Sequence, residues 1–153
     1  MSTSPALLAS RHARAWLTLV VILALHVTDE ALTDFLSVYN PIVLQLRAAW
    51  SWFPMPTFTF GPWLSGLTVL VIVLALLTPA IRTGGWLVAG GSFVFGILMF
   101  MNGVGHLAGS VYFGRWLPGA TTAPLLLLGS AWLLRTTWQR ITRATGSGLQ
   151  LPS

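Results

Sequence analysis

The chain has 153 residues, about the length of one domain, of which 55% are hydrophobic and only 7% are charged. A soluble domain normally carries about 25% charged residues, so the composition excludes a soluble protein and predicts one that is integral to a membrane. All eight basic residues are arginines, and they form no patch interleaved with aromatic residues, which argues against nucleic acid as a partner. The absence of cysteine excludes disulfides and thiolate metal ligands.

The apolar runs predict an all-α fold, a bundle of four transmembrane helices. A spanning helix needs about 20 residues to cross the hydrocarbon core. The expected spans lie at about residues 15–36, 63–81, 86–109 and 121–138, within a membrane domain of residues 15–138. Residues 1–14 are expected to form a polar lead, and residues 139–153 a basic and then small, polar tail.

The first run could also be a cleaved signal peptide, because its purely apolar part, residues 16–25, is short. No small-residue cleavage pattern follows it, which favours a spanning helix. Asn40-Pro41 is expected to end this helix. Residues 41–53 then show apolar residues at helical spacing and end in two tryptophans, which predicts a short amphipathic helix at the membrane interface between the first two spans.

The arginines predict the orientation of the chain. With four spans both termini lie on one side, and six arginines are on that side: Arg11, Arg14, Arg82, Arg135, Arg140 and Arg143. The positive-inside rule therefore places both termini in the cytoplasm, with the chain in a plasma or inner membrane. Arg47 and Arg115 lie on the outer side, so Arg115 is either an ordinary interfacial residue or a counter-ion to the acidic side chains. No convincing internal repeat supports a transporter built from inverted halves.

All three acidic side chains lie in the first expected span, together with a histidine. Ionisable residues in a membrane are costly and usually face a bundle interior or a water-filled cavity. His26, Glu30 and Asp34 recur at i, i+4 and i+8 and so share one helix face, with Asp29 beside it. Asp34 is near the expected interface, where it either belongs to a site or is a solvated acid. His12, in the lead, is expected to be exposed.

The third expected span carries a second polar pair. Asn102 and His106 are four residues apart and share a helix face. A stripe of small residues leads to His106 and predicts close contact with a neighbouring helix; it comprises Gly85, Ala89, Ser92, Gly96 and Gly103. Counting spans puts both polar groups in the outer half of the bundle, so we expect a pocket between spans 1 and 3. Asn102 could instead serve as a hydrogen-bonding contact between helices.

These motifs resemble the HXXEE family of small integral membrane proteins. The resemblance rests on three stretches: His26-Val-Thr-Asp29-Glu30, Asn102-Gly-Val-Gly-His106, and the connection from Tyr112 through Pro118-Gly119 to Thr122. Asp29 replaces the first glutamate of the family pattern, which keeps the charge and shortens its reach by one methylene. The resemblance implies a membrane-embedded enzyme and brings no established reaction.

The residue types favour a metal-dependent enzyme. Two histidines and a carboxylate with open coordination positions suit zinc or ferrous iron, with His26, Glu30 and His106 as ligands. Asp29 would be a proton acceptor or a partner of a ligand, and Asn102 and Arg115 would orient a lipophilic small molecule arriving from the lipid bilayer. A metal-free acid–base isomerase or cyclase and a proton-coupled carrier or channel subunit are the alternatives. Protein partners are left open.

Overall fold

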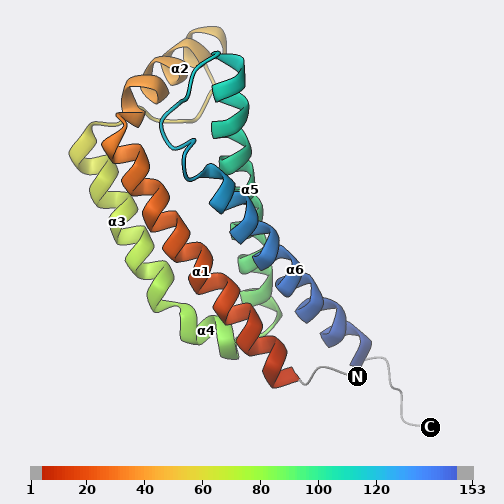
Figure 1. The fold of residues 1–153 in the computed structure, drawn as a ribbon. Helices are drawn as coiled ribbons and strands as arrows, with labels where there is room; N and C mark the ends of the chain where they lie inside the picture. The colour runs from red at the N-terminus through yellow and green to blue at the C-terminus, as the bar shows by residue number, and fades with distance from the viewer. Residues whose placement is uncertain (1–4, 148–153) are drawn as a thin grey trace.

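A computed structural model describes residues 5–147, and the regular secondary structure in this range is all helical (Figure 1). The helices are α1 (Pro5–Leu32), α2 (Phe35–Ala49), α3 (Phe60–Leu76), α4 (Thr78–Thr83), α5 (Trp86–Tyr112) and α6 (Ala123–Ser147). Helix α1, the pair α3–α4, α5 and α6 run alternately up and down, and α2 lies across one end (Figure 1). We call this the α2 end and the opposite one the α4 end. The predicted all-α fold is confirmed.

Helix α1 is displaced toward the N-terminus relative to its expected range. It begins at Pro5, inside the expected polar lead, and ends at Leu32. Asp34 then adopts a left-handed backbone with a φ of 58°, a conformation that aspartate tolerates better than most residues. The helix therefore ends before Asp34, and the expectation that Asp34 shares a continuous face with His26 and Glu30 is wrong. Its side chain is exposed.

The prediction that Asn40-Pro41 ends the first helix is also wrong, because both residues lie inside α2. Asn40 anchors the following loop instead: its Nδ2 donates to the Phe58 carbonyl (2.9 Å), and its Oδ1 accepts from the Phe58 N–H (3.1 Å). The Tyr39 hydroxyl donates to the Pro56 carbonyl (2.9 Å). Helix α2 therefore lies between α1 and α3, and these hydrogen bonds hold it against the loop that precedes α3.

The second expected span, residues 63–81, is interrupted at Leu77, where α3 gives way to α4. Pro79 has no N–H to donate to the Ala75 carbonyl one turn earlier. The Thr78 hydroxyl donates to that carbonyl instead (2.7 Å). The proline therefore explains the break, and the threonine satisfies the acceptor it leaves.

The core forms where α1 packs against α6 on one side and α3–α4 on the other (Figure 1). Trp16 is buried on α1, and its Nε1 donates to the Leu74 carbonyl of α3 (2.9 Å). The small-residue stripe of α5 faces α6: a Cβ on Gly103 would lie 3.1 Å from the Ala123 carbonyl oxygen, and one on Gly96 would lie 2.9 Å from Leu134 Cδ2. The predicted close approach of this stripe to a neighbouring helix is confirmed.

His12 is fully buried, and the prediction that it is exposed is wrong. Because the helix already begins at Pro5, His12 continues the buried face of α1 one turn before Trp16. Helix α6 continues past residue 138, so Arg140 reaches His12 and donates to its Nδ1 (2.9 Å). Arg140 also donates to the carbonyls of Ile81 and Gly84, which joins α1, α4 and α6 at the α4 end.

Within the described residues, two helices are long and apolar enough to cross a membrane, namely α1 over Ala6–Leu32 and α5 over Trp86–Tyr112. Only 22% of the apolar window of α5 is buried inside the protein. Most of this helix therefore presents its apolar side chains outward, unlike the core helix of a soluble protein. Helix α3 is also apolar but shorter, with 17 residues.

Candidate metal centre

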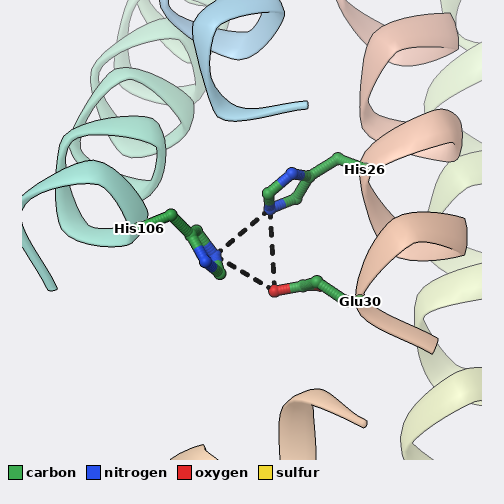
Figure 2. A group of neighbouring side chains, drawn as sticks. All are labelled: His26, Glu30 and His106. Atoms are coloured by element: carbon green, nitrogen blue, oxygen red, sulfur yellow. Dashed lines mark hydrogen bonds and ion pairs between the residues drawn. The ribbon is translucent and has the colours of Figure 1, made fainter. Parts of the chain in front are cut away.

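Three polar side chains from α1 and α5 converge on one point inside the bundle (Figure 2). His26 Nε2 lies 3.2 Å from His106 Nε2 and 3.6 Å from Glu30 Oε1, and His106 Nε2 lies 3.1 Å from the same oxygen. The side chains are 1%, 10% and 6% exposed for His26, His106 and Glu30. The expected proximity of the two helices' polar groups is therefore present, and we call these three residues the triad.

The connection between α5 and α6 fixes the ring of His106. This connection runs back into the bundle before α6 begins (Figure 1) and brings the Pro118 carbonyl to 2.7 Å from His106 Nδ1. A carbonyl oxygen can only accept a hydrogen bond, so Nδ1 carries the proton. In the neutral ring Nε2 then holds a lone pair directed at the triad.

Gly119 lets this connection approach both rings. Its φ of 79° is in the left-handed region that favours glycine. A Cβ there would lie 2.6 Å from His106 Cε1 and 3.0 Å from His26 Cε1. A side chain at this position is therefore incompatible with the observed placement of the two imidazoles.

Thr122 and Asp29 hold the ring of His26 in the same tautomer as that of His106, with the proton on Nδ1. The Thr122 hydroxyl lies 3.0 Å from Asp29 Oδ2, and the Thr122 N–H donates to the same oxygen (3.2 Å). Because a carboxylate oxygen only accepts, the hydroxyl donates to Asp29 and accepts from His26 Nδ1, 2.8 Å away. His26 Nε2 is thus left with a lone pair directed at the triad, and Asp29 acts on it through Thr122.

The triad therefore presents three electron-pair donors to one another in a buried site. Two imidazole lone pairs at 3.2 Å repel one another unless a cation lies between them. The nearby carboxylate oxygen adds to this repulsion. Tetrahedral zinc with ligands at about 2.0–2.1 Å separates its donor atoms by roughly 3.3 Å. The observed spacings of 3.1, 3.2 and 3.6 Å match this value, so the triad can hold a metal ion.

A largely apolar cavity of about 360 Å³ adjoins the triad at His106. Residues on one face of α2 form much of its wall: Phe35, Val38, Tyr39, Ile42, Val43 and Leu46. The Phe35 ring centroid is 5.7 Å from that of His106. Burial raises the pKa of the Tyr39 phenol, so this hydroxyl keeps the proton that it donates to Pro56. The apolar stripe of α2 thus encloses space next to the triad.

Asn102 also lines this cavity, one helical turn before His106. Its Oδ1 is buried, makes no close hydrogen bond among the residues that the structure describes, and lies near the His26 side chain. Asn102 therefore adjoins both the cavity and the His26 side chain.

Arg115 is not brought to the triad. It is exposed beside Trp116 and lines a separate surface hollow with Leu107 and Ser110. Neither ion pair found within residues 5–147 involves it, since both join Glu30 to a histidine. The suggested roles of Arg115 as counter-ion or substrate contact have no support from its position.

Three contributions to the site were not assigned from the sequence: the Pro118 carbonyl, Gly119 and the Thr122 hydroxyl. These residues belong to the motif between Tyr112 and Thr122, but their contacts with the histidines depend on the connection folding back toward α1. Comparison with family models, with curated proteins and with solved structures gives no match to this chain.

Replacing Thr122 by valine should weaken metal binding at the triad. The change keeps the side-chain shape but removes the hydroxyl that fixes His26, and loss of such a partner typically lowers metal affinity roughly 10- to 100-fold. Thr122→Ser, which keeps the hydroxyl, should bind nearly as well as the wild-type protein. Competition with a chromogenic chelator measures both affinities, and equal affinity of Thr122→Val and wild type would contradict the role of this hydroxyl.

Proposed function

We propose that the chain is a four-span membrane protein whose spans are α1, α3–α4, α5 and α6. The apolar length of α1 and α5 supports this arrangement, as does the exposure of large apolar side chains on α3, including Val69, Ile72 and Leu76 at 60%, 53% and 74%. Such exposure is unfavourable in water and expected in lipid. The arginine distribution supports an orientation with both termini and the α4 end in the cytoplasm. Membership of the HXXEE family stays a prediction.

Cysteine labelling tests this topology cleanly because the chain has no native cysteine. Ser51→Cys, between α2 and α3, should react with a membrane-impermeant maleimide in intact cells. Thr83→Cys, at the end of α4, should react only after the membrane is permeabilised. Labelling of both positions in intact cells would contradict the proposed spans, and the reverse pattern would contradict the orientation.

We propose that the protein is a metal-dependent membrane enzyme that binds zinc or ferrous iron through His26, Glu30 and His106. One observation carries this proposal: three buried donor atoms, two of them held by their Nδ1 partners as neutral imidazole nitrogens, surround one point. Three protein ligands leave coordination positions for water and substrate. The ion would polarise a substrate oxygen or activate a water, and it would offset the cost of burying Glu30.

A metal ion satisfies the geometry better than a proton. A proton between His106 Nε2 and Glu30 Oε1, which are 3.1 Å apart, leaves His26 Nε2 only the longer contacts to these two atoms, at 3.2 and 3.6 Å. A metal accepts electron pairs from all three. The metal-free acid–base alternative rests on the two ion pairs of Glu30, with His106 at 3.1 Å and with His26 at 3.6 Å.

The cavity next to His106 supports a lipophilic substrate. Its walls are mainly apolar, and the few polar groups in it include Asn102 and His106. Small-molecule sites commonly combine an apolar lining with a few polar groups that set the orientation of the ligand. In this proposal the apolar body of the substrate lies under α2, its polar end lies beside Asn102, and Asp29 orients His26 through Thr122.

Purified protein should contain about one equivalent of zinc or iron per chain. His26→Ala, Glu30→Gln and His106→Ala should each lose most of this metal, because each removes one of three ligands. Asp34→Asn removes an exposed carboxylate four residues after Glu30, and His12→Asn removes a histidine at the opposite end of α1, so both should retain the metal. Mass spectrometry of the metal content measures this; a folded wild-type protein without metal would sink the proposal.

Filling the cavity should abolish turnover without removing the metal. Gly105 lines the cavity, and a Cβ there meets no atom within 4 Å, so Gly105→Leu places its side chain in the open space. Gly91→Leu, at another uncrowded glycine of α5, is the matched control. Membrane lipid extracts incubated with each protein and compared by liquid chromatography–mass spectrometry should show a change with wild type and Gly91→Leu only. The same change with Gly105→Leu would exclude this cavity as the substrate site.

A further inference from the structure

A hollow lined by three arginines lies at the α4 end, away from the triad. It has a volume of about 350 Å³ and lies between α1 and α6. Arg11 and Arg14 are three residues apart on α1, and Arg135 is on α6; all three side chains are exposed. Trp132 and Gln139 complete much of its polar and aromatic lining.

The charge of this hollow is not balanced by acidic side chains. Asp29, Glu30 and Asp34 are the only acidic side chains in the sequence, and they lie toward the other end of α1. Three like charges around one hollow repel one another, and an anion placed among them would remove this repulsion. Guanidinium groups also match the oxygen geometry of phosphate, to which they donate paired hydrogen bonds.

The buried contacts behind the hollow keep its two walls together. His12 lies between Arg11 and Arg14 in the sequence, faces inward, and accepts from Arg140 of α6. Arg140 is itself fixed by the carbonyls of Ile81 and Gly84. The arginines of the hollow thus project from helices that are already joined, so no large rearrangement is needed to collect them around a ligand.

The position of the hollow relative to the apolar runs indicates the source of the anion. Arg14 directly precedes the apolar run of α1, and Arg135 directly follows the apolar run of α6. Under the membrane placement proposed above, both arginines lie at the level of the lipid headgroups. Trp132, which is 42% exposed, is of the residue type that favours this level. Basic pockets between helices on the cytoplasmic side are suited to anionic headgroups.

We propose that Arg11, Arg14 and Arg135 bind the phosphate of an anionic phospholipid of the cytoplasmic leaflet. The lipid would join the ends of α1 and α6 on the outside, as Arg140 joins them inside. This inference depends on the membrane placement of the chain and is independent of the metal at the triad.

Native mass spectrometry of the delipidated, detergent-purified chain titrated with phosphatidylglycerol or phosphatidylcholine tests the proposal. The wild-type protein should retain phosphatidylglycerol preferentially. Its affinity should fall about fivefold in Arg135→Gln and about 100-fold in the triple variant Arg11→Gln/Arg14→Gln/Arg135→Gln, following the usual contribution of each arginine near anionic lipid. Arg82→Gln removes the same charge at the same end but outside this hollow, so it should leave the affinity nearly unchanged.

Equal retention of the two lipids would overturn the proposal, as would an equal loss of affinity in Arg82→Gln and Arg135→Gln. Displacement of the lipid by millimolar inorganic phosphate would assign the hollow to a free anion and contradict a lipid site. The single variant Arg135→Gln keeps the test decisive if the triple variant does not fold. The cysteine-labelling pattern is read separately, so a wrong membrane placement is distinguishable from an empty arginine hollow.

Discussion

Two buried imidazole nitrogens and a carboxylate oxygen face one another in the α2 half of this protein. The packing of that half has to hold these three atoms together. Such donors repel one another in the absence of a cation, so the surrounding chain must hold each ring in place. The Nδ1 atom of each ring is bound to an oxygen that accepts its proton, Pro118 for His106 and Thr122 for His26. The lone pairs that meet at the triad are therefore a consequence of bonds made behind the rings.

Those bonds depend in turn on how closely three segments approach. Helix α5 reaches α6 because Gly96 and Gly103 have no side chains, and the connection after α5 reaches the two rings because Gly119 has none. Helix α2 covers the same region from the end of the bundle, where Asn40 fixes it to the loop before α3. The polar centre and the apolar cavity beside it are thus products of the same packing.

Charge is divided between the two ends of the molecule. The acidic side chains lie toward the α2 end, whereas most arginines lie toward the α4 end. In the proposed orientation this division satisfies the positive-inside rule and leaves the acids free to build a site in the outer half of the membrane. Arg140 shows that the α4 end also uses a partly buried cation structurally, since its partners are backbone carbonyls and an acceptor nitrogen of His12.

Regular helix spacing made part of this arrangement predictable. His26 with Glu30, and Asn102 with His106, are each four residues apart, so their shared faces follow from the helix alone. The Thr122 contact could not be predicted, because it joins residues 96 positions apart and depends on the path of a connection. Asp34 was misplaced because a single left-handed residue ended α1 early, and His12 because the expected polar lead is already helical at Pro5. The positions of Asp34 and His12 and the Thr122 contact depend on local backbone conformations and long-range contacts, which helix periodicity does not predict.

X-ray absorption at the metal edge of the purified, metal-containing protein tests the central claim most directly, because it reports the atoms bound to the ion. The proposed centre predicts two imidazole nitrogens and at least one oxygen at about 2.0–2.1 Å for zinc. It also predicts that His106→Ala, if it retains any metal, shows one imidazole fewer. A spectrum without imidazole scattering, or one that His106→Ala leaves unchanged, would contradict a metal held by His26, Glu30 and His106.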